Sequence, residues 1–366
     1  TSLKLDKTEI DEGDTVTLSG TFKDPGRLDT FTIDVDWGDG VLKTYQLPSV
    51  GAFANGVGSF SIAKKIVDDH PDTGTPSDML KVKVTLRDDD TGEAQDELDL
   101  KVNNLEPEFG TVTLTDNPSE EGDTVTLKGS FTDKGEKDTF KLVVDWGDGS
   151  AAGTFDIESV GSFDAGSGTF ELTHVYADDE DPGEDDIYTV SYKLIDDDTG
   201  EVEDSQDITI TNADPEIENL DLPDEVDEGD GVFVKFDVKD KGEDDEITIT
   251  IDWGDGTVDT FAGLGTAPFG FANDTKHVYV DDDPSGTSSD PVTVTITVRD
   301  DDDGEVVATR TITVNNVAPS DIDLGGDREA AFGEVVTVSV LSFEDPGGAD
   351  TFSYDWSVTS PSGVSN

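Results

Sequence analysis

Aspartate and glutamate are the residues of this chain whose number and spacing could do chemistry. They recur in clusters, such as the run DDDTGE at 88–93, which returns unchanged at 196–201 and with one substitution at 300–305. Grouped carboxylates supply the hard oxygen ligands that Ca²⁺ prefers, about six to eight of them in a loose geometry. Paired carboxylates can also act as general acid and base. Here the pairs recur without a repeated His, Lys or Arg partner, so we expect calcium sites and no enzyme active site.

The composition excludes several classes of protein. The 366 residues include 23 Lys and Arg against 87 Asp and Glu, a net charge of −64. Such a chain has no basic surface for nucleic acid or for an anionic membrane. It has no cysteine, which excludes disulfides, zinc–thiolate sites and thiol catalysis. No apolar run is long enough to predict a membrane span, and the N-terminus shows no targeting signal.

Three sets of markers repeat with one period of a little over 100 residues. The tryptophans are Trp37, Trp146, Trp253 and Trp356, and the segment EGDTVTL at 12–18 returns at 121–127 and, more loosely, at 228–234. Asn-containing, Pro-ended junctions separate the units. We therefore predict repeats at 1–105, 106–213 and 214–317 and a partial, divergent fourth at 318–366. Both ends resemble cuts in a longer array. Because the junctions are short, consecutive repeats should meet end to end.

Within each repeat the hydrophobic period is two. Ile33, Val35 and Trp37 alternate with Thr32, Asp34 and Asp36, and the second and third repeats match this pattern. Seven or so short alternating strands in about 105 residues predict an antiparallel β-sandwich. The fold class is therefore all-β, with tandem immunoglobulin-like sandwiches arranged end to end and no helix.

The run VDWGDG at 35–40, repeated at 144–149 and as IDWGDG at 251–256, resembles the signature of PKD domains, which are immunoglobulin-like sandwiches of surface proteins and secreted enzymes. The family's later His-x-Tyr is matched by His174 with Tyr176, and by HVY at 277–279, whereas the first repeat has Lys64 and Ile66 instead. The fourth repeat lacks Gly-Asp-Gly after its tryptophan. The resemblance implies extracellular spacing, adhesion or protein contact, and it supplies no catalytic residues.

Immunoglobulin-like topology places the B–C and F–G loops at the pole where the chain enters a sandwich, and the A–B and E–F loops at the opposite pole. We call these the N-terminal and C-terminal poles. At the N-terminal poles the candidate metal ligands are Asp24, Asp29, Asp88 and Asp90, then Asp133, Asp138, Asp196 and Asp198, then Asp240, Asp245, Asp300 and Asp302. At the C-terminal poles they are Glu12, Asp14, Asp68 and Asp69, then Glu121, Asp123, Asp178 and Asp179.

When such repeats stack, an acidic C-terminal pole faces an acidic N-terminal pole, and the like charges repel. Ca²⁺ bound between the poles would remove this repulsion, and cadherin arrays, whose Asn- and Pro-containing junctions are similar, solve the problem in this way. The alternative is a surface adapted to high salt, on which acidic residues only hold hydration. The sequence fits both.

Other motifs have structural interpretations that we favour. The tryptophans should plug the cores rather than stack on carbohydrate, and His174 and His277 should be packed and hydrogen-bonded rather than ligate metal. Asn273 fits a glycan acceptor pattern, but a single match is near chance.

The sequence thus predicts a non-enzymatic, calcium-rigidified rod segment of a long extracellular or cell-surface protein, bacterial or archaeal. Its function would be structural: adhesion, spacing, or a subunit of a surface fibre or layer. Its partners would be copies of itself or other surface proteins. The alternative is a module of a secreted enzyme that binds polysaccharide or protein. Exposed side chains at Phe53, Phe163, Phe269 and Phe271 would favour that alternative.

Overall fold

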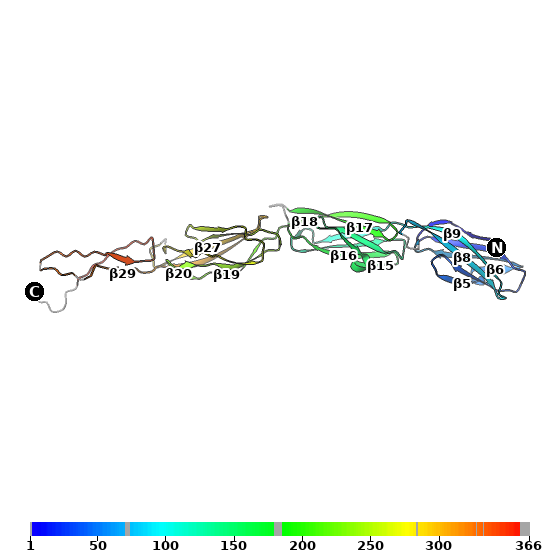
Figure 1. The fold of residues 1–366 in the computed structure, drawn as a ribbon, viewed down its shortest axis with the longest axis horizontal. Coiled ribbons are helices and arrows are strands. Elements are labelled where there is room, and N and C mark those ends of the chain that lie inside the picture. The colour runs from blue at the N-terminus through cyan, green and yellow to red at the C-terminus, as the bar shows by residue number, and fades with distance from the viewer. Residues whose placement is uncertain are drawn as a thin grey trace. The chain divides into compact units, whose positions relative to one another are not determined.

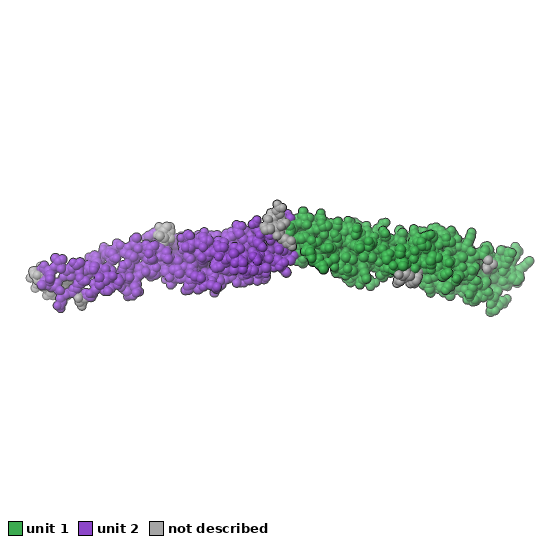
Figure 2. All heavy atoms as spheres, turned by 45° about the horizontal axis from the view of Figure 1, so that its top comes forward, with its two compact units in different colours: residues 1–119, 123–176, 186–210 green, residues 120–122, 177–185, 211–366 purple. Residues whose placement is uncertain are grey.

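The computed structural model describes residues 2–69, 74–178, 185–282, 285–326, 328–331 and 333–358. The chain divides into two compact units (Figure 2), and Figure 1 labels strands of each. Unit 1 comprises Thr1–Ser119, Asp123–Tyr176 and Asp186–Ile210, and unit 2 comprises Glu120–Gly122, Ala177–Asp185 and Thr211–Asn366. Unit 1 therefore holds two sandwiches, whereas the C-terminal pole of the second sandwich is counted with unit 2.

The first sandwich pairs a four-stranded sheet, in the order β1-β3-β7-β6, with a five-stranded sheet, β2-β9-β8-β4-β5. Strand β2 runs parallel to β9, and the other pairs are antiparallel. The elements are β1 Ser2–Leu5, β2 Glu9–Asp11, β3 Thr15–Lys23, β4 Phe31–Asp36, β5 Leu42–Gln46, α1 Leu47–Val50, β6 Gly51–Ala54, β7 Val57–Lys65, β8 Ser77–Asp88 and β9 Glu93–Asn103.

The second sandwich repeats this topology, with sheets β10-β12-β16-β15 and β11-β18-β17-β13-β14. Its elements are β10 Glu108–Thr115, β11 Ser119–Glu120, β12 Thr124–Thr132, β13 Phe140–Asp145, β14 Gly153–Asp156, α2 Ile157–Val160, β15 Gly161–Asp164, β16 Ser167–Val175, β17 Asp186–Asp196 and β18 Glu201–Thr211.

The third sandwich, in unit 2, has sheets β19-β22-β25, β21-β26 and β20-β28-β27-β23-β24. Its strands are β19 Glu216–Asp221, β20 Glu225–Asp227, β21 Gly231–Val232, β22 Lys235–Lys239, β23 Thr248–Asp252, β24 Val258–Phe261, β25 Phe269–Ala272, β26 His277–Val278, β27 Ser289–Arg299 and β28 Glu305–Asn315. Beyond it, β29 (Ser320–Asp323) pairs with β30 (Ser342–Glu344).

Alternating burial builds one hydrophobic core in each sandwich. In β4 every second residue is buried, and Trp37, Trp146 and Trp253 are at most 7% exposed. The all-β fold of tandem immunoglobulin-like sandwiches is thereby confirmed. Trp356 is 56% exposed, so it does not occupy the buried position of the other three tryptophans. Within the described part of 318–358 only the pair β29–β30 forms, and it gives Trp356 no core to enter.

The expectation of no helix was wrong in a small way. Two helices of four residues, α1 and α2, follow β5 and β14 and bury Leu47 and Ile157. Each is a single turn, which is too short for a period of 3.6 residues to appear in the sequence.

Candidate metal centres

Glu12 is the central residue of the acidic cluster where the two sandwiches of unit 1 meet. It directly follows β2 and is only 1% exposed. Its Oε1 accepts a 2.7 Å hydrogen bond from the backbone N–H of Leu105, in the segment that connects the sandwiches. Its Oε2 is buried and accepts no hydrogen bond within the described part of the chain. One oxygen is therefore fixed by the backbone, and the other is available to a ligand.

The glycine after Glu12 lets the next repeat approach. Gly13 has a φ of +77°, and a Cβ there would lie 3.1 Å from the Cβ of Lys134, in the B–C loop of the second sandwich. In the same place the backbone N–H of Glu136 donates to the carbonyl of Val67 (2.8 Å), and Lys65 pairs with Glu136 (2.5 Å). The EGD motif therefore brings the two acidic poles together.

Three aspartates of the second sandwich face this pole from its B–C and F–G loops. Asp133 Oδ1 caps the Gly135 N–H at 2.8 Å, while its Oδ2 and the Oδ2 of Asp138 are buried and accept no hydrogen bond from described residues. Asp196 Oδ1 accepts from the N–H groups of Asp198 and Gly200, and its Oδ2 accepts from the Asn104 amide at 3.0 Å. These local bonds shape the loops and leave oxygens directed at the cluster.

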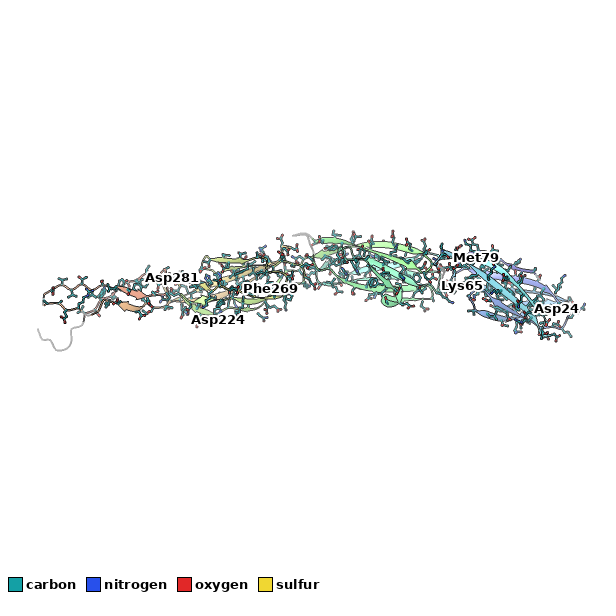
Figure 3. All side chains as sticks on the ribbon, viewed as in Figure 1. Asp24, Lys65, Met79, Asp224, Phe269 and Asp281 are labelled. Carbon is teal, nitrogen blue, oxygen red and sulfur yellow. The ribbon has the colours of Figure 1, made fainter. Side chains whose placement is uncertain are left out.

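At least three groups of described carboxylates occur in this cluster, and in each group one oxygen of every residue lies within 4.8 Å of one oxygen of the others. The groups are Glu12 with Asp133 and Asp138, Glu12 with Asp68 and Asp69, and Asp69 with Asp78 and Asp198. The first and third groups combine residues of both sandwiches, whereas the second lies within the C-terminal pole of the first sandwich. The poles of the first sandwich can be compared in Figure 3, where Asp24 lies at one end and Lys65 at the other.

Burial and mutual repulsion disfavour the charged forms of these carboxyls. Burial, together with the charges of Asp133 and Asp69, raises the pKa of Glu12 to about 8, even though the Leu105 N–H lowers it. Burial and the charge of Glu12 raise the pKa of Asp138 to about 9. Burial is also the main cause that raises the pKa of Asp133 to about 6. A cation among these groups would replace the solvation that they have lost.

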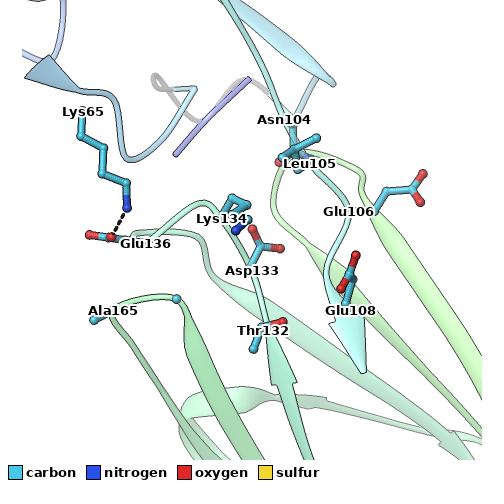
Figure 4. A pocket seen from close by; sticks show the side chains of 11 residues that line it. Lys65, Asn104, Leu105, Glu106, Glu108, Thr132, Asp133, Lys134, Glu136 and Ala165 are labelled. Carbon is cyan, nitrogen blue, oxygen red and sulfur yellow. Dashed lines mark hydrogen bonds and ion pairs between the residues drawn. The ribbon is translucent and has the colours of Figure 1, made fainter. Parts of the chain in front are cut away.

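A cavity of about 720 Å³ lies beside the cluster (Figure 4). Asp133 and Asn104 line it, and the ion pair of Lys65 with Glu136 closes one side. Asn104 also carries a buried Oδ1 that accepts no hydrogen bond among the described residues. The cavity gives ions from solvent a route to Asp133, and Asn104 offers a neutral oxygen ligand that we did not predict from the sequence.

Unit 2 contains the same arrangement around Glu121. Its Oε1 accepts a 2.8 Å hydrogen bond from the Ala213 N–H. Asp245 is 1% exposed, and neither of its oxygens accepts a hydrogen bond in the described ranges. Burial and the charge of Glu121 raise the pKa of Asp245 to about 8, and burial raises that of Asp240 to about 6. The charge of Asp178 also raises the pKa of Asp245.

The F–G loop of the third sandwich completes this second cluster. Asn212 donates to Asp300 Oδ2 at 3.2 Å, as Asn104 does to Asp196. Asp302 is buried, and its backbone N–H donates to Asp300 Oδ1. Asp179 lies outside the described residues.

A further acidic group in unit 2 was missed by the sequence analysis. It joins Glu228, Asp281 and Asp282 of the third sandwich to Asp350 of the fourth repeat within 4.8 Å. The Glu228 Oε1 accepts from the Val317 N–H at 2.7 Å, repeating the contacts of Glu12 and Glu121. The signal was present, because DPGGAD at 345–350 has the spacing of DPGRLD at 24–29.

Other predicted ligands differ in their surroundings. Asp24, Asp29 and Asp88 come together within 4.8 Å and are partly exposed. Asp90 is exposed and donates its backbone N–H to Asp88. Asp14 forms an exposed ion pair with Lys7 at 3.0 Å, and Asp123 is exposed. The buried predicted ligands therefore lie mainly around the glutamates of the EGD motifs.

The histidines have structural contacts. The ring of His174 stacks on Trp146 with centroids 4.7 Å apart, and its Nε2 is 2.6 Å from Asp148 Oδ2. The Tyr176 hydroxyl donates to the carbonyl of Trp146 at 2.9 Å. His277, with Trp253 and Tyr279, repeats these contacts in the third sandwich. In the first sandwich, Lys64 pairs with Asp39 instead.

The side chains that could have formed an aromatic platform pack inward. Phe53 stacks on Phe22 and Phe163 on Phe131. Phe271 is 8% exposed, and Phe269 packs against the core of the third sandwich. Asn273 is buried, and its Oδ1 accepts from the Val234 N–H at 2.7 Å, so its amide supports the fold and is not presented as a glycan acceptor.

The two helices that the structure describes have four residues each, too few to cross a lipid bilayer. No protein-family profile and no curated protein matches the chain.

Among solved structures, the chain is similar to a tetra-tandem repeat in the extending region of a large adhesion protein, with 17% identity and a TM-score of 0.38 over 88% of this chain and 76% of that one. It is also similar to a D1–D4 ectodomain fragment of ICAM-5, with 12% identity and a TM-score of 0.29 over 88% and 79%. The adhesin InvE of Yersinia pseudotuberculosis gives 13% and 0.30 over 58% of each chain. Similarity at this level does not establish a function.

Proposed function

We propose that this chain is a non-enzymatic structural or adhesive segment of an extracellular or cell-surface protein, built from tandem PKD-like sandwiches that Ca²⁺ holds together at their junctions. The observation that carries the proposal is the geometry of Glu12. The backbone of Leu105 fixes one of its oxygens, while the other is buried near Asp133 and Asp138 without a hydrogen bond from described residues. Glu121 and Glu228 make the same backbone contact.

Burial argues for metal binding over adaptation to high salt. Acidic residues that only hold hydration must contact water, yet Glu12 and Asp69 are 1% and 0% exposed. A buried carboxylate without a partner is costly unless it is neutralised or coordinates a metal. Ca²⁺ fits the donor set because all the donors are hard oxygens from loops, and it tolerates variable ligand number and geometry.

Small-angle scattering from the full chain tests this proposal. Extracellular calcium modules bind at about 10⁻⁴–10⁻³ M. In millimolar Ca²⁺ we expect the scattering profile of a stiff, elongated array, and after chelation that of a flexible one, because the repelling poles then separate. An identical profile and maximum dimension with and without chelator would contradict the proposal.

A further inference from the structure

The junction within unit 1 holds a second group of carboxylates besides those around Glu12. Asp69 follows β7, Asp78 is the second residue of β8, and Asp198 lies in the loop between β17 and β18 of the next sandwich. One oxygen from each lies within 4.8 Å of the others. The group therefore draws on both sandwiches of unit 1.

Asp69 gives independent support for a ligand at this position. It is 0% exposed, and neither of its oxygens accepts a hydrogen bond from the described residues. Asp198 is 2% exposed, and its Oδ1 is held by the Gly74 N–H at 3.1 Å. A fully buried carboxylate whose two oxygens accept no hydrogen bond from described residues, next to two further carboxylates, is costly unless it is protonated or binds a cation.

A single ion does not account for all these groups. Ca²⁺–oxygen bonds are about 2.4 Å long, so two oxygens on one ion lie at most about 4.8 Å apart. The carboxylates of this junction form at least three groups of that size among the described residues. Glu12 and Asp69 each belong to at least two of these groups. Because an ionised carboxylate has two oxygens and about four lone pairs, each of these residues can bridge neighbouring ions.

We infer that the junction between the first two sandwiches binds at least two divalent cations, one held by Glu12, Asp133 and Asp138 and another held by Asp69, Asp78 and Asp198. The inference rests on the proposed function and deepens it. Asp68, grouped with Glu12 and Asp69, joins the two positions.

Counting bound Ca²⁺ per full-length chain by equilibrium dialysis tests the inference. The variants are Glu12→Gln, Asp78→Asn and the double variant, with Asp96→Asn, at an exposed aspartate of β9, as the matched control. If the two ions bind independently, each single variant should lose one ion and the double variant two. If they bind cooperatively, each single variant should already lose both. The control should lose none.

Two results would overturn the inference and leave the proposed function standing. The first is that Asp78→Asn loses no ion. The second is that each single variant loses one ion and the double variant also loses only one, because both residues would then bind the same ion. A wild-type chain that binds no Ca²⁺ would overturn both. Circular dichroism checks the fold of each variant. If Asp78→Asn does not fold, Asp198→Asn removes a ligand of the same ion from the other sandwich and gives the same alternatives.

Discussion

The backbone N–H of Leu105 donates a 2.7 Å hydrogen bond to Oε1 of Glu12. Glu12 belongs to the C-terminal pole of the first sandwich and Leu105 to the segment leading into the second, so this bond fixes the glutamate where the two acidic poles meet. An equivalent bond joins Ala213 to Glu121 and Val317 to Glu228. The repeated EGD motif thus supplies one buried carboxylate to each cluster.

Replacing Glu12 with glutamine should weaken the response of the chain to Ca²⁺. The amide can still accept the Leu105 hydrogen bond, but it removes one negative charge from the ligand set. A ligand stabilises a protein only by binding its native state, so the calcium-dependent rise in melting temperature should shrink. Differential scanning calorimetry measures it, with Glu203→Gln, at an exposed glutamate of β18, as the control. An equal rise in both variants would exclude Glu12 as a ligand.

The metal-free chain should become less stable as the pH rises. The folded-state pKa values are raised, to about 6 for Asp133, about 8 for Glu12 and about 9 for Asp138, so the folded state binds these protons more tightly than the unfolded state. Their contribution to stability is complete below about pH 4, the ordinary carboxyl range, and is lost as pH rises through the folded values.

In chelator, the melting temperature should therefore fall between pH 5 and pH 9, and saturating Ca²⁺ should flatten this dependence above neutral pH. A melting temperature in chelator that is constant or increases over this range would show that the carboxyls are not buried together in solution.

Two glycine substitutions separate backbone strain from contact between the sandwiches. Gly13 and Gly40 have similar φ values of +77° and +72°, but a Cβ at Gly13 would meet Lys134, whereas one at Gly40 has no neighbour within 4 Å. Alanine at either position should cost roughly 1–2 kcal/mol for the left-handed conformation. Gly13→Ala should in addition raise the calcium concentration needed for half-maximal stabilisation. Equal calcium midpoints for the two variants would mean that Gly13 does not position the junction.

Removing the hydroxyl of Tyr176 should affect stability and not calcium. Tyr176→Phe loses the hydrogen bond to the Trp146 carbonyl, which is worth about 1 kcal/mol. Chemical denaturation should show this loss with the calcium midpoint unchanged. A shifted midpoint would indicate that the Trp–His–Tyr contact acts on the metal site.

The sequence predicted the sandwiches because burial alternates strictly in strands such as β4, and the position of Trp37 follows from that alternation. It also placed Glu12 opposite Asp133 and Asp138, because immunoglobulin-like topology determines which loops share a pole. Asp78 could not be found in this way, since it lies within a strand and belongs to the site only through the approach of Asp198 from the next sandwich. The exposed position of Trp356 likewise depends on packing, which its strand pattern does not specify.

The central claim is that the buried junction carboxylates bind Ca²⁺ specifically, and thermal unfolding of the chelator-treated full chain tests it most directly. CaCl₂ is added to one sample and NaCl of equal ionic strength to another. We predict a saturable rise in melting temperature over about 10⁻⁴–10⁻³ M Ca²⁺ that NaCl does not reproduce. An equal rise in NaCl would show that the acidic residues respond only to screening, and would contradict the claim.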